Sequence, residues 1–139
     1  FAAVKKEFST SHVYISAAAI SDIEFKTTDK KIKKSDSPSL DYTWGVDILA
    51  EVLKLKENQK IISFAAESQI TPEVIREKFE KKPVDLMVAN QVSNGAGSNI
   101  QGFGTDSNTY YLVIEGKIVE EANLTKRQLA ERILESVEK

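Results

Sequence analysis

Three short and nearly continuous apolar runs constrain the fold of this chain more than any other feature of its sequence. They are residues 12–19 (HVYISAAA), 60–66 (KIISFAA) and 84–89 (VDLMVA). Runs of this kind are typical of strands that are buried on both faces, as in a parallel sheet. Because helical patterns alternate with these runs, the sequence predicts an α/β layered fold with a mostly parallel sheet.

Helical patterns precede the second and the third run. Residues 46–56 (VDILAEVLKLK) carry apolar side chains at helical spacing, with Asp47 near the positive end of the helix. Thr71 followed by Pro72 predicts the start of the next helix, because Thr is a favourable cap and Pro fits the first helical position. Pro83 would end that helix.

The C-terminal part predicts a β-hairpin followed by a helix. Residues 109–115 (TYYLVIE) and 117–119 flank a glycine, which is typical of a hairpin. Thr125 and Gln128 have the spacing of a capping box, which would open the last helix. At the other terminus, residues 1–8 have the pattern of the end of an amphipathic helix.

Composition excludes several classes of function. The net charge of −2 makes the chain a poor candidate for non-specific binding to nucleic acid or to a membrane. The absence of Cys excludes disulfides, thiolate metal sites and cysteine nucleophiles, and it fits a cytoplasmic protein. A single histidine, His12, cannot build a His-rich metal site, and we expect it to be structural or exposed. No run reaches the roughly 20 apolar residues that span a bilayer.

Lysine supplies the candidate binding chemistry. Residues 21–42 are predicted to form one long polar loop, and five of its lysines fall within nine residues: Lys26, Lys30, Lys31, Lys33 and Lys34. Such a loop can close over phosphates, or it can be an ordinary solvated loop, and composition favours neither. Lys78 and Lys82 are four apart and share a helix face, so they could hold one anion together. The alternative is that they complement the helix dipole and pair with neighbouring glutamates.

Ligands of open α/β sheets bind beyond the C-terminal ends of the strands, which directs attention to two aspartates. Asp22 follows the first apolar run and could bind a ribose or a metal, or simply cap a turn. Asp47 stands at a helix start that could otherwise bind a phosphate, and it would repel one unless a cation such as Mg²⁺ screened it. Neither a P-loop motif nor a G-x-G-x-x-G motif occurs. The residues alone therefore predict an α/β domain that binds a phosphorylated small molecule through lysine.

Six segments together resemble the C-terminal part of phosphopantothenate–cysteine ligase (phosphopantothenoylcysteine synthetase) of coenzyme A biosynthesis. They are residues 17–22 (AAAISD), 31–34 (KIKK), 46–49 (VDIL), 64–67 (FAAE), 85–90 (DLMVAN) and 102–108 (GFGTDSN). The resemblance implies a Rossmann-like three-layer fold with a mostly parallel sheet, a C-terminal antiparallel hairpin and a helix. By this resemblance residues 1–139 form one domain, which is the C-terminal portion of the ligase domain. We expect the first strands and the acyl-phosphate loop of the family to precede it, since the chain begins with Phe1 rather than Met.

The resemblance implies a reaction as well as a fold. The carboxylate of 4′-phosphopantothenate attacks the α-phosphate of CTP, or of ATP in some lineages, with Mg²⁺, and pyrophosphate leaves. The amine of cysteine then displaces the nucleotide and forms an amide. A homodimer, a cytoplasmic location and an upstream flavin decarboxylase domain are also implied.

The roles of individual residues follow by matching positions within the resembling segments. Lys31 would be the catalytic lysine, carried on a mobile flap. The nucleotide would be contacted by Ala18, Ala19, Asp22, Val46, Asp47, Ile48, Leu49, Phe64, Lys78 and Lys82, and no residue is assigned to a metal. In this reading Lys78 and Lys82 hold the triphosphate, Phe64 packs against the nucleotide, and the helix start approaches it.

Some positions depart from the family pattern and leave other functions open. Gly45-Val46 stands where the family has Asn-Pro, and Ser63 stands where it has Gly, so the sequence does not decide between CTP and ATP. One alternative is a non-catalytic nucleotide-binding or regulatory module of the same fold. Another is a nicotinamide-dependent oxidoreductase, against which the missing G-x-G-x-x-G motif counts.

Overall fold

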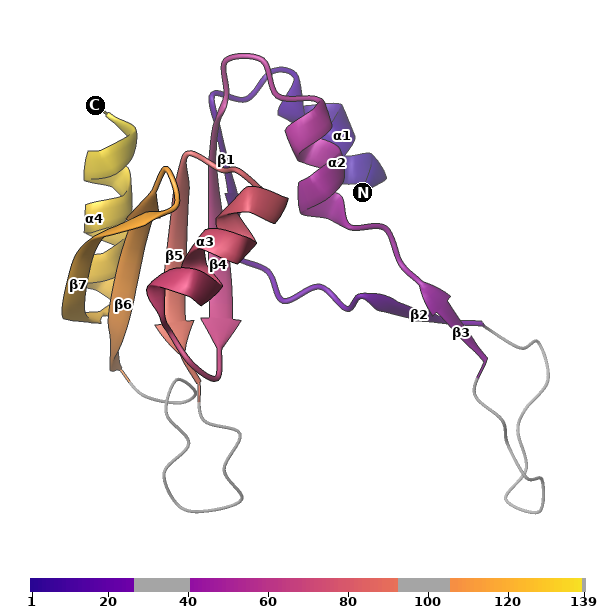
Figure 1. The fold of residues 1–139 in the computed structure, drawn as a ribbon. Coiled ribbons are helices and arrows are strands. Elements are labelled where there is room, and N and C mark those ends of the chain that lie inside the picture. The colour runs from indigo at the N-terminus through magenta and orange to yellow at the C-terminus, as the bar shows by residue number, and fades with distance from the viewer. Residues whose placement is uncertain (27–40, 93–105, 139) are drawn as a thin grey trace.

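A central mixed sheet organises the chain in the computed structural model, which describes residues 1–26, 41–92 and 106–138 (Figure 1). Its five strands lie in the order β1-β4-β5-β6-β7. Their bounds are β1 Val13–Ser16, β4 Lys60–Glu67, β5 Leu86–Gln91, β6 Ser107–Ile114 and β7 Lys117–Thr125. β1, β4 and β5 run parallel, whereas β6 and β7 are antiparallel additions. The three apolar runs thus form the parallel part, as predicted.

Helices cover both faces of this sheet and produce three layers. α1 (Ala2–Phe8), α2 (Ile48–Lys54) and α3 (Pro72–Lys81) pack on one face, and α4 (Lys126–Val137) packs on the other (Figure 1). The predicted α/β three-layer fold is therefore confirmed. None of the helices in the described ranges is long and apolar enough to cross a membrane.

Alternation along β4 divides the core between the two faces. Ile61 and Ala65 face α1, α2 and α3, whereas Ile62 faces α4, because successive side chains of a strand point to opposite sides. Ile61 and Ile62 are fully buried. Burying an aliphatic side chain of this size stabilises a fold by about 1.5–3 kcal/mol, so this strand anchors both layers.

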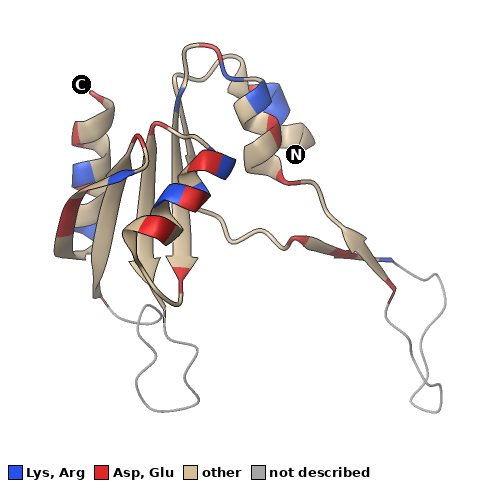
Figure 2. Cartoon of the chain, in the orientation of Figure 1, with Lys and Arg blue, Asp and Glu red and all other residues tan. Residues whose placement is uncertain are grey.

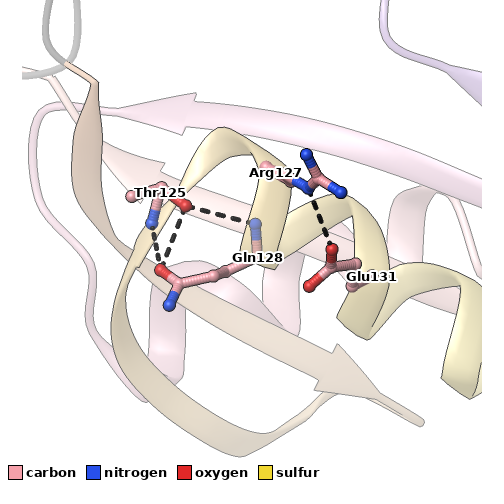
Figure 3. A network of polar contacts seen from close by, with 4 residues as sticks. All are labelled: Thr125, Arg127, Gln128 and Glu131. Atoms are coloured by element: carbon pink, nitrogen blue, oxygen red, sulfur yellow. Dashed lines mark hydrogen bonds and ion pairs between the residues drawn. The ribbon is translucent and has the colours of Figure 1, made fainter.

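Capping residues set the starts of α3 and α4. The Thr71 hydroxyl accepts a hydrogen bond from the backbone N–H of Val74 at 3.3 Å, with Pro72 as the first helical residue. At α4 the Thr125 hydroxyl accepts from the backbone N–H of Gln128 at 3.2 Å, and the Gln128 side chain accepts from the Thr125 N–H at 2.9 Å (Figure 3). The predicted helix starts and the capping box are confirmed.

The predicted hairpin is confirmed and is longer than expected. Ile114 pairs with Lys117, so Glu115 and Gly116 form a two-residue turn. Both have positive φ, which suits the turns that join twisted antiparallel strands. A Cβ added to Gly116 would lie 3.1 Å from the Phe79 ring of α3, so the turn also packs closely against that helix.

A small two-stranded ribbon corrects the prediction of one long loop over residues 21–42. β2 (Ile23–Phe25) and β3 (Tyr42–Trp44) pair antiparallel outside the main sheet. Apolar, polar and aromatic residues alternate in both short segments, which favours strands, but each is too short to stand out from sequence alone. Every residue of the ribbon is exposed, and Figure 1 shows it extending away from the sheet.

Candidate functional site

The candidate site lies at the carboxyl edge of the parallel strands. Ser16 at the end of β1 is level with Ser63, and Glu67 at the end of β4 is level with Gln91 of β5. The backbone N–H of Val92 donates to the Glu67 carbonyl at 2.8 Å, which ties the ends of β4 and β5 together. This is the edge at which ligands bind in open α/β sheets.

Lys78 reaches this edge through an ion pair. Its ammonium group contacts the carboxylate of Glu67, the last residue of β4. The side chain of Lys78 remains 41% exposed and that of Glu67 is 23% exposed. A cation from the middle of α3 is thus held at the end of the neighbouring strand.

Lys82 makes a second pair from the end of the same helix. Its ammonium group lies 2.5 Å from the carboxylate of Asp47, the residue that caps α2. The other oxygen of that carboxylate accepts the backbone N–H of Ala50 at 3.0 Å. The start of α2 is therefore capped by the chain's own carboxylate, and its contact with a nucleotide stays a prediction. Figure 2 shows the alternating charges along α3.

The ionisation of Asp47 reflects these contacts. Partial burial by itself would raise the pKa of its carboxyl group, but the hydrogen bonds from Lys82 and Ala50 and the positive charge of Lys82 outweigh it. The pKa of Asp47 is consequently lowered from its ordinary value. Asp47 is therefore a carboxylate near neutral pH, and an incoming anion must compete with it for Lys82.

The predicted aromatic contact, Phe64, lies on the other side of the sheet. It is level with Val88 and shares the α4 face with Ile62, whereas Glu67 shares the opposite face with Ala65. Phe64 is 38% exposed. The structure does not bring Phe64 together with the two lysines, and a ligand that touches all three would have to pass around the end of β4.

The segment after β1 leaves the sheet at the same edge. Ala18, Ala19 and Asp22 are exposed. The backbone carbonyl of Asp22 accepts the N–H of Gly45 at 2.9 Å, which makes Asp22 part of the base of the ribbon. These residues are exposed, and their contact with a nucleotide stays a prediction.

Residues at the start of α2 divide between surface and core. Val46 is exposed, whereas Ile48 and Leu49 are half-buried and pack against the core on the helical face of the sheet. The side chains of Ile48 and Leu49 thus contribute to packing, and the contact of residues 46–49 with a nucleotide stays a prediction. The predicted catalytic residue, Lys31, and the glycine-rich segment 102–105 lie outside the described residues.

A metal site is not preformed in the part of the chain that the structure describes. That part contains no group of three or more His, Asp or Glu side chains arranged to hold a metal. The carboxylates nearest to the candidate site, Asp47 and Glu67, are each engaged by a lysine. His12 is exposed, as expected, and its backbone carbonyl accepts the N–H of Lys60.

A hollow of about 620 Å³ lies elsewhere, between α3 and the turn of the hairpin. Apolar side chains such as Phe79 and Ile118 line it. The positively charged Arg76 and Lys117 and the negatively charged Glu80 line it as well. Charges of both signs surround this hollow, so its lining does not select an anion.

Sequence reasoning missed Glu67 as a partner of Lys78. Glu67 belongs to the segment FAAE that carries the resemblance, and it directly follows an apolar strand, so a signal was present. What the sequence could not show is which of the many glutamates lies beside this lysine.

Comparison with known proteins adds to this geometry. The model of the DNA/pantothenate metabolism flavoprotein C-terminal domain matches residues 1–139. The chain belongs to this family. The family that the sequence resembles is thereby confirmed.

Relatives of this C-terminal domain are coenzyme A biosynthesis bifunctional proteins, CoaBC. The protein of Bacillus subtilis is 40% identical over 109 residues, which cover 76% of this chain and 26% of the relative. That of Escherichia coli K12 is 33% identical and covers 80% and 28%, and that of Thermococcus kodakarensis is 30% identical and covers 91% and 31%. The chain thus spans only about a quarter to a third of the length of these relatives.

Solved structures of the family have the same fold. The C-terminal domain of a CoaBC protein superimposes with a TM-score of 0.65 at 30% identity, covering 99% of this chain and 60% of that one. The DNA/pantothenate metabolism flavoprotein of Streptococcus pneumoniae gives a TM-score of 0.74 at 18% identity, covering 99% and 67%. This second likeness supports the fold alone.

Proposed function

We propose that the protein carrying this chain is a phosphopantothenate–cysteine ligase of coenzyme A biosynthesis, and that the chain supplies part of its nucleotide site. The observation that carries the proposal is the pair Lys78 and Lys82. These cations lie one turn apart on α3 in a family whose relatives are CoaBC proteins: Lys78 contacts Glu67 at the carboxyl edge of the parallel strands, and Lys82 contacts the cap of α2. Two ammonium groups one helical turn apart are suited to a polyphosphate.

The proposed reaction has two steps that share one nucleotide. A carboxylate oxygen of 4′-phosphopantothenate attacks the α-phosphorus of CTP or ATP, the bond to the β-phosphate breaks, and pyrophosphate leaves. The cysteine amine then attacks the acyl carbon, the nucleoside monophosphate leaves, and the amine loses a proton. Negative charge grows on the phosphates in the first step, so fixed ammonium groups would stabilise it.

Mg²⁺ enters this proposal as the partner of the nucleotide rather than as a resident ion. Mg²⁺ in such sites is commonly held by substrate phosphates and only one or two carboxylates. It would neutralise phosphate charge when bound. The contributions of this chain are to bind the polyphosphate through Lys78 and Lys82 and to bring Lys31, by resemblance, to the reacting acyl-nucleotide.

The proposed assembly is a homodimer in the cytoplasm. The exposed ribbon supports a partner, because a two-stranded ribbon is marginal by itself and Trp44 is 77% exposed on it. The bifunctional relatives are also longer than this chain, which is consistent with a fused flavin decarboxylase domain upstream.

The test is pyrophosphate release by the full-length protein with phosphopantothenate, cysteine and each nucleotide in turn. Lys31→Gln should reduce product formation by at least about 100-fold, because an electrostatic contact made in the transition state is removed, while the nucleotide still binds. Lys26→Gln is the matched control from the same lysine-rich segment and should retain activity.

Near-normal turnover by Lys31→Gln would contradict the catalytic role of this lysine. Nucleotide binding by the wild-type protein without pyrophosphate release would favour the non-catalytic module instead. Release with one nucleotide and not the other would decide between CTP and ATP.

A further inference from the structure

Glu67 is placed to control the availability of Lys78. It ends β4, and its backbone carbonyl is held by the N–H of Val92 at 2.8 Å. The next residue, Ser68, accepts a hydrogen bond from the Gln91 side chain at 2.9 Å. The backbone that carries the Glu67 carboxylate is therefore fixed from two sides, and the carboxylate projects from a rigid strand end.

Lys78 is the more adaptable partner. Its ammonium group is carried on a four-carbon chain from α3, and its side chain is more exposed than that of Glu67. When a polyphosphate arrives, the lysine can turn toward it, whereas the carboxylate stays at the strand end. The ion pair must be broken or shared for Lys78 to bind phosphate.

The charges of the two lysines of α3 are balanced before any ligand is present. Lys78 is matched by Glu67 and Lys82 by Asp47, so the cluster has two positive and two negative groups. An anion gains little attraction from a neutral cluster at a distance, and it meets a carboxylate beside each lysine. The free energy of phosphate binding is thus reduced by the strength of the pairs that it must replace.

We propose that Glu67 is a positioning residue that brings Lys78 to the carboxyl edge and competes with phosphate for it, which limits the affinity for the polyphosphate. This inference rests on the nucleotide-binding part of the proposed function. Glu67 acts through Lys78 and does not itself touch the reacting atoms. The competition would keep the polyphosphate from binding too tightly, so that the pyrophosphate product can leave.

The experiment measures binding of inorganic tripolyphosphate to the full-length protein by calorimetry. Glu67→Gln keeps the shape of the side chain and removes its charge, and it should bind tripolyphosphate about threefold to fivefold tighter, as expected from the strength of a partly exposed pair. Glu67→Asp keeps the charge and should return the affinity toward that of the wild type. Glu51→Gln, which breaks the surface pair of Glu51 with Lys54 on α2, is the matched control and should leave the affinity unchanged.

A double-mutant cycle separates competition from simple repulsion. In a Lys78→Met background Glu67→Gln should change the affinity by less than about 1.5-fold, because the partner through which it acts is gone. An undiminished effect in that background would overturn the positioning role. Unchanged or weaker binding by Glu67→Gln alone, or no binding of tripolyphosphate by the wild type, would overturn the inference as well.

The pyrophosphate assay distinguishes this inference from the proposed ligase function. Product formation together with an unchanged affinity of Glu67→Gln would reject the inference and retain the ligase. Tighter binding by Glu67→Gln in a protein that forms no product would support the inference and reject the ligase.

Discussion

The two edges of the parallel strands use the same kind of ion pair in different ways. At the amino edge Lys56 contacts Asp85 at 2.7 Å, and the same carboxylate oxygen accepts the backbone N–H of Ile61 at 2.7 Å. At the carboxyl edge the Glu67 carboxylate has Lys78 as its partner among the contacts of the described residues. Asp85 therefore joins two strands, whereas Glu67 holds a side chain that can leave.

The contrast indicates how to separate a structural ion pair from a functional one. A carboxylate that also satisfies a buried backbone N–H cannot give up its position without leaving that donor unpaired. A pair with a long, partly exposed lysine loses little when it opens. Substitutions at the amino edge should consequently change stability, and substitutions at the carboxyl edge should change binding.

The largest expected effect is on nucleotide binding by the two lysines of α3, of which Lys78 lies at the carboxyl edge. Lys78→Ala combined with Lys82→Ala should weaken nucleotide binding by about 10- to 100-fold, since each charge-assisted contact contributes about 1.5–3 kcal/mol and part of it is offset by the pairs already present. Calorimetry with CTP and with ATP measures the effect. Unaltered affinity would mean that the lysines only complement the dipole and pair with acids, and the comparison of the two edges would fail.

The amino edge should show the next largest effect, in stability. Asp85→Ala should lower the free energy of unfolding by about 1–3 kcal/mol, because the Ile61 N–H loses its acceptor and Lys56 loses its partner. Urea denaturation measures the change. Glu131→Ala, which breaks the exposed pair with Arg127 on α4 (Figure 3), is the control and should change stability by less than about 0.5 kcal/mol. Equal losses in the two variants would show that the amino edge is no different from an ordinary surface.

The smallest expected effect is the pH dependence of that stability. Burial alone would raise the pKa of Asp85, but the hydrogen bonds from Lys56 and Ile61 and the charges of Lys56 and Lys60 outweigh it and lower the pKa below the ordinary 3.8. A group whose pKa is lower in the folded state stabilises the fold above its unfolded pKa, and the contribution is lost as pH falls through the folded pKa. The stability difference between wild type and Asp85→Asn should thus be constant above about pH 5 and shrink below about pH 4.

Denaturation curves between pH 7 and pH 3 provide the measurement. The pKa of Asp47 is lowered as well, so this group also contributes to the pH dependence of stability. Because Asp47 is present in both proteins, its contribution cancels in the difference. A difference that grows as the pH falls would have the wrong sign for an ion pair at Asp85.

Much of the fold could be predicted because its signals are local. The cap at Thr71, the box of Thr125 with Gln128 and the apolar run of β4 each depend on residues within a few positions of one another, and all are present in the structure. The ribbon was missed because three-residue strands carry too little pattern to distinguish them from a loop.

The candidate site could be predicted only in part. The sequence by itself determined that Lys78 and Lys82 share a face, because that follows from helical geometry. It also determined the family resemblance, which the match to the C-terminal domain model confirms.

Only the tertiary structure decided what these lysines contact. Glu67 and Asp47 meet them because β4 and α2 pack beside α3, and Phe64 is kept away because strand alternation turns it to the other face. These contacts join residues that are distant in sequence, and no local pattern encodes them. The physical reason is that burial of the two apolar faces of the sheet sets where each helix lies, and the charged side chains pair with whatever that packing brings within reach.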